Sequence, residues 1–384
     1  MRTSVEHELQ TPVEPISLIR STPPTPPWVG EALARTLGEI GASPKIESLM
    51  RYHTFRGSED DRNVASRWLS ERFGADAGID RIIMTNGTQS ALFLALRTAV
   101  GIGNHLLTED ISYYGLRRLA ALLGITVSGI AMDSDGALPD AFDEACRTRR
   151  PRALFLQPTL HNPTSTVMSR TRRIALAEVA RKHGVPIIED DVYGSLPSIA
   201  PEPIAAIAPD ICWFASGPAK CMGPGLRLGY LVAPSGAEAE KAVTAFDTIS
   251  TWHANPLSAA IMSRWVGDGT LANIRNAVRE EIVARQTIAR QCLSHLSLAT
   301  HPESVFLWMG LPASLDQASF LQRLSDDGVI LRPGHMFFVD QSKSDNHIRV
   351  VLGSPETKDE LVTALATLSR LLAELAGGSI ESRG

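Results

Sequence analysis

The middle of the chain alternates short aliphatic runs with segments of helical apolar spacing, and this alternation restricts the fold more than any other feature. The aliphatic runs are Arg81–Thr85, His105–Thr108, Thr126–Met132, Ala153–Gln157, Pro186–Glu189, Ile211–Ser216 and Leu226–Val232. Helical segments between them include Ser90–Val100, Leu116–Leu123 and Arg170–His183. Buried strands that alternate with helices predict an α/β fold with a mostly parallel central sheet. Such a sheet binds its ligands at the carboxyl ends of its strands.

The pattern changes after Pro234, where long helices and then a smaller α+β unit follow. The predicted elements are helices at Glu238–Thr248, Ala272–Leu293 and Glu356–Leu375, and strands near Val305–Met309, Val329–Arg332 and Ile348–Leu352. A chain of 384 residues is long enough for two domains. We predict an N-terminal arm and part of a small domain over residues 1–50, a large domain over 51–245 and a C-terminal small domain over 246–384.

Composition argues against several other classes of protein. A net charge of -5 and a pI near 6.1, without a basic run, argue against nucleic-acid binding. No apolar stretch approaches the roughly 18 residues that a membrane span requires. The N-terminal segment MRTSVEHELQTPVEP lacks the apolar core of a signal peptide, so we expect a cytoplasmic protein. The four cysteines show no CxxC spacing, which argues against a disulfide framework or a zinc site.

One lysine, Lys220, lies between two strand-like runs in the segment Ile211–Pro234. The chain has only six lysines, and the other five lie in polar or helix-surface contexts. Burial would lower the pKa of the Lys220 amine and make it a nucleophile for Schiff-base formation. Arg227 could supply the bidentate cation that a phosphate needs. This pair predicts pyridoxal phosphate, and a loop lysine that extends to solvent is the alternative.

Two segments that follow strands are further candidates for ligand contacts. In the segment Gly87–Gln89 a strand turns at a glycine into a helix, whose first amides are unsatisfied and can bind phosphate. An ordinary helix cap by Thr88 is the other interpretation. A later loop places Tyr113 beside Tyr114, and a tyrosine there could stack on a flat ring or pack in the core.

Polar residues also follow two other strands. Asn162 is held extended by the proline that follows it and can present its amide to a ligand, although Asn-Pro is also common turn chemistry. Glu189, Asp190 and Asp191 end a buried strand, where three carboxylates are costly without a cation. A magnesium ion, a solvated strand end or a protonated pyridine nitrogen would each account for them.

Taken together, these motifs resemble the class I and II aminotransferases, which are fold-type I pyridoxal phosphate enzymes, and within them the MocR-like branch. The resemblance extends from about Ile16 to Leu375. It rests on the order and spacing of NPT at Asn162–Thr164, EDDVY at Glu189–Tyr193 and KCMGPGLR at Lys220–Arg227. It implies an aspartate aminotransferase-like fold in which the large domain, residues 51–245, binds pyridoxal phosphate.

The resemblance implies roles for the matching residues. Lys220 would hold the cofactor aldehyde as an aldimine, and Asp190 would bind the pyridine nitrogen. Asn162 and Tyr193 would hydrogen-bond the ring hydroxyl. The remaining cofactor contacts would come from Gly87, Thr88, Gln89, Ser216 and Arg227 at the phosphate and from Tyr113 on the ring face.

Two further residues concern the substrate and the partner subunit. Arg349, in HIRVVLG, resembles the arginine that binds the α-carboxylate of the substrate, with Asn162 beside it. Tyr52, in YHTFRG, resembles the tyrosine that reaches the phosphate in the neighbouring subunit. The resemblance therefore implies a homodimer with shared active sites.

Three features depart from the family pattern. Gly217, Pro218 and Ala219 stand where serines often precede the lysine, and Ser165 stands where a glycine usually follows NPT. MocR-like proteins commonly carry an N-terminal winged-helix domain, for which there is no room before Ile16. These departures shift the expected phosphate binding toward Arg227 and the helix start, and they favour an enzyme over a regulator.

We therefore predict an aminotransferase that moves an amino group between an α-amino acid and a 2-oxo acid in ping-pong order, with Lys220 as the base. The alternatives are another reaction of the same cofactor, such as elimination or racemisation, and a poorly catalytic effector-binding module. A metal-dependent hydrolase that uses the acids at positions 189–191 is the third. The sequence assigns no second arginine to an acidic substrate.

Overall fold

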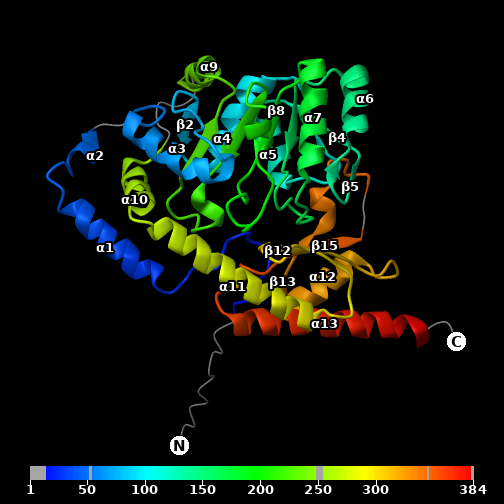
Figure 1. Cartoon of the computed structure of the whole chain (residues 1–384). Coiled ribbons are helices and arrows are strands. Elements are labelled where there is room, and N and C mark those ends of the chain that lie inside the picture. The colour runs from blue at the N-terminus through cyan, green and yellow to red at the C-terminus, as the bar shows by residue number, and fades with distance from the viewer. Residues whose placement is uncertain (1–13, 52–53, 248–253, 344–345, 382–384) are drawn as a thin grey trace, which may run out of the picture.

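The computed structural model describes residues 14–51, 54–247, 254–343 and 346–381, and a central sheet with helices on both faces dominates it (Figure 1). The sheet has seven strands, in the order β2 (Ile82–Thr85), β10 (Gly229–Val232), β9 (Cys212–Ser216), β8 (Ile187–Asp190), β7 (Ala153–Leu156), β3 (His105–Glu109) and β4 (Thr126–Ile130). β10 is antiparallel to both of its neighbours, and all other neighbours are parallel. The predicted mostly parallel sheet is confirmed.

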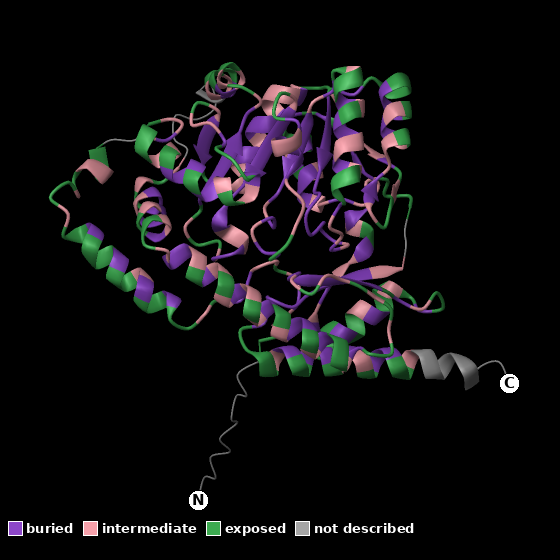
Figure 2. Ribbon diagram, viewed as in Figure 1, coloured by how far each residue is buried: buried purple, intermediate pink, exposed green. Residues whose placement is uncertain are grey.

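Each face of the sheet has its own apolar core, because successive strand residues point to opposite faces. The strands of the central sheet are largely buried (Figure 2). Ile82 and Met84 belong to one core, and Ile83 between them belongs to the other. The first core is covered by α3 (Glu59–Phe73), α6 (Pro139–Arg149), α7 (Arg170–His183) and α8 (Ile204–Ile207). The second is covered by α4 (Thr88–Ala95), the π-helical η1 (Leu96–Val100), α5 (Tyr114–Leu122) and α9 (Gly236–Asp247).

Two of the aliphatic runs predicted as strands of the large sheet form strands with different limits. The run Leu226–Val232 becomes a strand only from Gly229, because Arg227 has a φ of 49°, in the left-handed region that a strand does not contain. The run Thr126–Met132 is divided after Ile130, and β5 (Met132–Asp133) pairs with β6 (Gly136–Ala137) instead. The other runs form strands whose limits lie within one residue of those predicted.

The smaller α+β unit contains an antiparallel sheet in the order β11 (Leu298–Ala299), β12 (Phe306–Gly310), β15 (His347–Val351) and β14 (Arg332–Pro333). Its core includes side chains from α12 (Gln317–Asp326) and α13 (Lys358–Glu381). The predicted strand Val329–Arg332 is divided, since β13 (Val329–Ile330) pairs with β1 (Ile16–Ser17) of the N-terminal arm. Leu18, directly after β1, is fully buried in this small core.

The helices that connect the two units pack in the first of the two cores of the central sheet. The proline-rich segment 23–27 has no regular structure, because proline does not fit a helix interior, and it leads into α1 (Val29–Gly41). α10 (Pro256–Gly267) packs in the large core, where Trp265 donates a hydrogen bond to Thr36 of α1 at 2.9 Å. α11 (Thr270–Cys292) contributes Ile282 to the large core and Ala289 to the small one. We propose that the limit of the large domain, predicted after residue 245, lies within α11.

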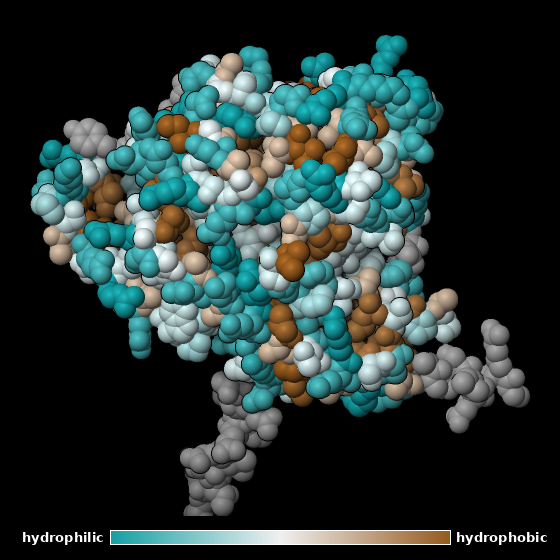
Figure 3. All heavy atoms as spheres, in the orientation of Figure 1, coloured by the Kyte–Doolittle hydropathy of each residue, from teal (hydrophilic) through white to brown (hydrophobic). Residues whose placement is uncertain are grey.

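The outer surface seen in Figure 3 is mostly hydrophilic, with apolar side chains in scattered patches. Among the helices of the described residues, none combines the length and the apolar character that crossing a membrane would require.

Candidate active site

A cavity of about 280 Å³ lies where the carboxyl ends of β7 and β8 meet the start of α4. The large domain, the small unit and the N-terminal arm all contribute to its walls. The predicted site residues that it brings together are Gly87, Thr88, Gln89, Tyr113, Asn162, Asp190, Tyr193, Lys220, Arg227 and Arg349.

The start of α4 forms one corner of this cavity. Gly87 is the N-cap residue and has a φ of 80°, which a glycine adopts without strain. No side chain caps the helix, so Thr88 is not the ordinary cap that we considered. Instead, the buried Thr88 hydroxyl lacks a hydrogen-bond partner among the described residues. The guanidinium of Arg227 adjoins this corner, since a Cβ on Gly87 would lie 3.2 Å from its Nη2 atom.

Two glycines allow the backbone segments of this corner to lie close together, because they have no side chain. A Cβ on Gly229 would lie 2.5 Å from the carbonyl carbon of Gly87 and 2.7 Å from the nitrogen of Thr88. A Cβ on Gly217 would lie 3.1 Å from the Thr88 hydroxyl. Helix-start amides, a free hydroxyl and a guanidinium around one space fit a phosphate group.

One predicted cofactor ligand is not part of this arrangement, and another cannot be placed. Ser216 is buried but does not line the cavity, and its hydroxyl donates a hydrogen bond to the carbonyl of Asp191 at 3.1 Å. The phosphate role of Ser216 therefore has no support in its placement. Tyr52 lies outside the described residues.

Lys220 ends the short 3-10 helix η2 (Pro218–Lys220), which follows β9 directly. Its Nζ atom donates a hydrogen bond to the carbonyl of Ser21 in the N-terminal arm at 2.5 Å and lies 5.6 Å from the ring centre of Tyr193. Burial, assisted by the positive charges of Arg349 and Arg227, lowers the pKa of the Lys220 amine to about 8, against the opposing effect of Asp190. A larger fraction of this amine is therefore neutral and nucleophilic at physiological pH.

In the protein without cofactor, Lys220 is expected to reach half of its maximal reactivity near pH 8. An ordinary lysine titrates at about 10.4, so the neutral fraction at pH 8 should be about 100-fold larger for Lys220. Competitive acetylation over a pH series, followed by peptide mass spectrometry, measures this midpoint, and the other lysines provide the reference curve. The variant Arg349→Gln removes a neighbouring cation and should move the midpoint to higher pH. A reactivity that still rises above pH 10 would contradict the expectation.

Of the described residues that line the cavity, Asp190 alone carries a carboxylate. Its Oδ2 atom accepts a hydrogen bond from Nε2 of Gln157 at 2.7 Å, and Oδ1 accepts one from the backbone amide of Val192 at 3.3 Å. Burial raises the pKa of Asp190 to about 7, although these hydrogen bonds oppose the shift. A carboxylate held in this way is stabilised by a cationic partner in the cavity, and a protonated pyridine nitrogen would be one.

The two neighbouring acids have separate partners outside the cavity. Glu189 lies 3.5 Å from Arg173 and accepts hydrogen bonds from the first amides of α8. Asp191 forms an ion pair of 2.8 Å with Arg72. Because the three carboxylates do not converge on one point, they do not favour a metal-dependent hydrolase. Within the described residues, no group of three or more histidine, cysteine or acidic side chains is placed to hold a metal ion.

Arg349, on β15, is fully buried on the side of the cavity formed by the small unit. Its Nη1 atom donates to Oδ1 of Asn162 and its Nη2 atom to the carbonyl of Ile19, both at 2.8 Å. The guanidinium also lies 4.8 Å from the ring centre of Phe337, while its Nε is buried without a partner among the described residues. A planar fork with an unsatisfied donor fits the carboxylate of a ligand.

Tyr113 and Gln89 border the cavity together. Gln89 donates a hydrogen bond from Nε2 to the Tyr113 hydroxyl at 2.9 Å. Burial raises the pKa of that hydroxyl, so it stays protonated at neutral pH. The ring of Tyr113 also packs against Tyr114, with ring centres 5.3 Å apart. Its orientation is fixed by these contacts before any ligand binds.

The structure adds site residues that the sequence pattern did not single out. Gln157 binds Asp190 and also lines the cavity, as does Arg332 of β14. A buried pair of Glu109 and His161 lies in the same region, with Oε2 and Nε2 4.0 Å apart. Burial raises the pKa of Glu109 to about 8 and lowers that of His161 to about 4, so between these values both are uncharged. Their position at a strand end was the signal that could have found Gln157 and Glu109.

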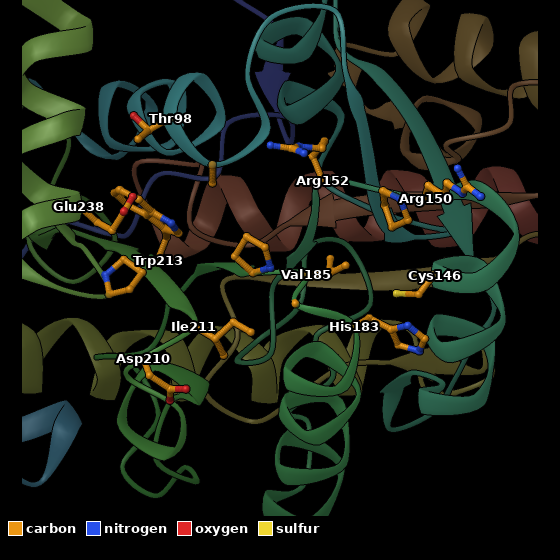
Figure 4. A pocket seen from close by; sticks show the side chains of 15 residues that line it. Thr98, Cys146, Arg150, Arg152, His183, Val185, Asp210, Ile211, Trp213 and Glu238 are labelled. Atoms are coloured by element: carbon orange, nitrogen blue, oxygen red, sulfur yellow. The ribbon is translucent and has the colours of Figure 1, made fainter.

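A second cavity, of about 620 Å³, lies at the opposite end of the strands (Figure 4). Two of its polar residues already have partners, since Asp210 pairs with Arg181 at 2.6 Å and Nε2 of His183 lies 2.7 Å from Oδ1 of Asp143. None of the predicted site residues in the described part of the chain lines it. Ligands of parallel sheets bind at the carboxyl ends of strands, so the cavity around Lys220 is the candidate active site.

Comparison with known proteins identifies the class to which this site belongs. The family described as aminotransferase class I and II matches residues 22–365, and the chain therefore belongs to this family. The cofactor of its members is pyridoxal phosphate. The chain is 26% identical to the 2-aminoadipate transaminase of Thermus thermophilus over 321 residues, which cover 81% of this chain and 77% of that protein.

Other relatives show how broadly the fold is used. An archaeal alanine:glyoxylate aminotransferase has a TM-score of 0.85 at 25% identity, with 94% of this chain and 92% of that chain covered. The helix-turn-helix-type transcriptional regulator YdeF of Bacillus subtilis is 26% identical over 307 residues, which cover 80% of this chain. This match covers only 66% of the length of YdeF. The predicted aspartate aminotransferase-like fold is confirmed.

Proposed function

We propose that this chain transfers an amino group between an α-amino acid and a 2-oxo acid, with pyridoxal phosphate as its cofactor. The observation that carries the proposal is the position of one reactive amine, Lys220, in a single cavity. The amine lies between two ends of the cavity that carry different side chains. One end offers Asp190 and the anion-binding corner at Gly87, and the other offers Arg349. Cofactor and substrate would therefore meet at the amine.

The residues at the first end fit the parts of the cofactor. The start of α4 and Arg227 would bind its phosphate, and Asp190 would bind the ring nitrogen. Tyr113 would cover a ring face, while Asn162 and Tyr193 would hydrogen-bond the ring hydroxyl. When bound, pyridoxal phosphate supplies an electron sink for the carbanion that forms when a substrate Cα loses its proton.

The residues at the second end would position the substrate and move the proton. Arg349, held by Asn162 and by the carbonyl of Ile19, would bind the α-carboxylate through its fork and fix the orientation of the Cα–H bond. Lys220, with its lowered amine pKa, would take the Cα proton and return it. The arm that carries Ile19 and Ser21 would help to exclude water from the cavity.

The quaternary and cellular context remains a prediction. A homodimer with shared active sites rests on Tyr52, which lies outside the described residues. Met50, two residues earlier, is 89% exposed and would be covered in such a dimer. A cytoplasmic location rests on the sequence alone.

The test is a pair of half-reactions with the cofactor-loaded protein. Each amino acid of a panel is mixed with excess protein, and we expect one equivalent of 2-oxo acid to form while the cofactor becomes its amino form. Addition of a different 2-oxo acid should then restore the starting absorbance. Release of ammonia or carbon dioxide, or inversion at Cα, would indicate a lyase or a racemase instead. Binding without any of these conversions would support an effector-binding module and contradict the proposal.

A further inference from the structure

Arg332 lies directly opposite Arg349 in the small sheet. The two residues are partners in the antiparallel pairing of β14 with β15. Residues directly opposite each other on neighbouring strands project from the same face of a sheet, with Cβ atoms roughly 5 Å apart. Both side chains accordingly line the cavity. The site therefore presents two guanidinium groups side by side at the end that would receive the substrate.

The guanidinium of Arg332 lacks an anionic partner in the described part of the chain. Its buried Nε atom has no hydrogen-bond partner among the described residues, and its Nη1 atom donates at 3.5 Å to the sulfur of Met336, which is a weak acceptor. Its charged carbon lies 4.7 Å from the ring centre of Tyr114. A partly buried cation with an unused donor is unfavourable unless a ligand supplies an anion.

The charges that line the cavity are also unbalanced. Among its described lining residues Asp190 is the only carboxylate, whereas the cations are Lys220, Arg227, Arg332, Arg349 and the exposed Arg20. In the proposed function, Arg227 faces the cofactor phosphate and Arg349 faces the α-carboxylate of the substrate. Arg332 has no counterpart in a cofactor and a substrate with an uncharged side chain.

We propose that Arg332 binds a second carboxylate, on the side chain of the substrate. The substrates of this site would then be acidic amino acids and the matching 2-oxo dicarboxylic acids. The inference rests on the proposed transaminase function for the reaction, but the binding preference follows from the two guanidinium groups themselves. Arg332 is a specificity-determining residue in this arrangement, because its fork would discriminate a dicarboxylate from a monocarboxylate of the same length.

The experiment measures binding by calorimetry, without any turnover. The cofactor-loaded protein is titrated with glutarate, a dicarboxylate, and with pentanoate, a monocarboxylate with the same number of carbons. One charge-assisted, bidentate contact should make glutarate bind about 10- to 100-fold more tightly. In Arg332→Gln this ratio should fall close to one, mainly through weaker binding of glutarate. Arg332→Lys keeps the charge without the fork and should give an intermediate ratio.

Arg118→Gln is the matched control. Arg118 is exposed, and its guanidinium carbon also lies near the Tyr114 ring, 5.6 Å from its centre, but it does not line the cavity. Its loss removes the same charge near the same ring and should leave the ratio unchanged. If Arg332 only supports Tyr114 and the turn at Met336, Arg332→Gln will weaken both acids equally, which would overturn the proposal. A wild-type protein that does not discriminate between the acids would overturn it even if the variants fail to fold.

The readouts separate this inference from the proposed function. A protein that prefers glutarate through Arg332 but converts no amino acid would retain the dicarboxylate site and refute the transaminase. A protein that transaminates leucine and glutamate with equal kcat/KM, and binds both acids equally, would remain a transaminase and refute the role of Arg332. In the expected result, Arg332→Gln lowers kcat/KM for glutamate by about 10- to 100-fold and leaves that for leucine unchanged.

Discussion

Replacing Lys220 with alanine is expected to lower turnover by about 10⁴-fold, the upper range for loss of a positioned acid–base group. It should also abolish covalent attachment of the cofactor, because no other lysine lines the cavity among the residues that the structure describes. Borohydride reduction of the loaded protein followed by peptide mass spectrometry measures this attachment. In the wild-type protein the cofactor mass should lie on the peptide that contains Lys220.

Lys241→Ala provides the control for this prediction. Lys241 is exposed on α9, where it pairs with Glu238, far from the cavity lining. This variant should keep both the absorbance of the bound cofactor and full turnover. Reduction of Lys220→Ala that traps the cofactor on another lysine, or turnover within tenfold of wild type, would contradict the assignment of the nucleophile.

Asp190→Asn should have the second largest effect and lower turnover by about 10²- to 10³-fold, as the loss of one preorganised electrostatic partner typically does. The amide cannot stabilise a positive charge on the ring nitrogen, so the electron sink is weakened. Cofactor affinity should fall as well, measured by equilibrium dialysis of the loaded protein.

The same variant, Asp190→Asn, should increase the stability of the cofactor-free protein. The pKa of Asp190 is raised by burial to about 7, so ionisation of its carboxyl costs stability as pH rises from about 4 to 7.

Thermal unfolding at pH 8 tests that second part, because Asp190→Asn removes the buried charge and should raise the Tm of the cofactor-free protein. The neighbouring variant Asp191→Asn is the matched comparison. Asp191 pairs with Arg72 outside the cavity, so its loss leaves a buried cation unpaired and should cost about 3–5 kcal/mol of stability. Asp191→Asn should nevertheless retain the turnover of the wild-type protein per folded molecule. If both variants lose stability alike and keep turnover, Asp190 has no special role.

The strands of the large sheet could be predicted because each depends on local sequence. The positions of Asp190, Lys220 and Asn162 in the site could be predicted for the same reason. Short aliphatic runs produced β7 and β8, and polar residues placed directly after them reached the same edge of the sheet. Lys220 follows β9 by the same logic. These predictions require only that the strands are parallel, because the carboxyl ends of parallel strands lie at the same edge of the sheet.

Other contacts depended on tertiary geometry that spacing does not contain. Ser216 precedes Lys220 closely in sequence, yet its hydroxyl faces the backbone of Asp191 rather than the cavity. Arg332 becomes a neighbour of Arg349 only through the pairing of β14 with β15, which depends on where the run Val329–Arg332 is divided. The contact between Gln157 and Asp190 likewise depends on the orientation of side chains on adjacent strands.

The pairing of β1 with β13 delays the assembly of the catalytic cavity during protein synthesis. Ile16 meets Val329, more than 300 residues later in the chain, so the arm cannot dock until almost the whole polypeptide has left the ribosome. Contacts between such distant residues carry a loop-closure cost and form late in folding. Ser21 of the arm contacts Lys220, and Ile19 contacts Arg349. We therefore expect the nascent chain to form the strands and helices of its large domain first and to close the cavity around Lys220 only in the last stage of its folding.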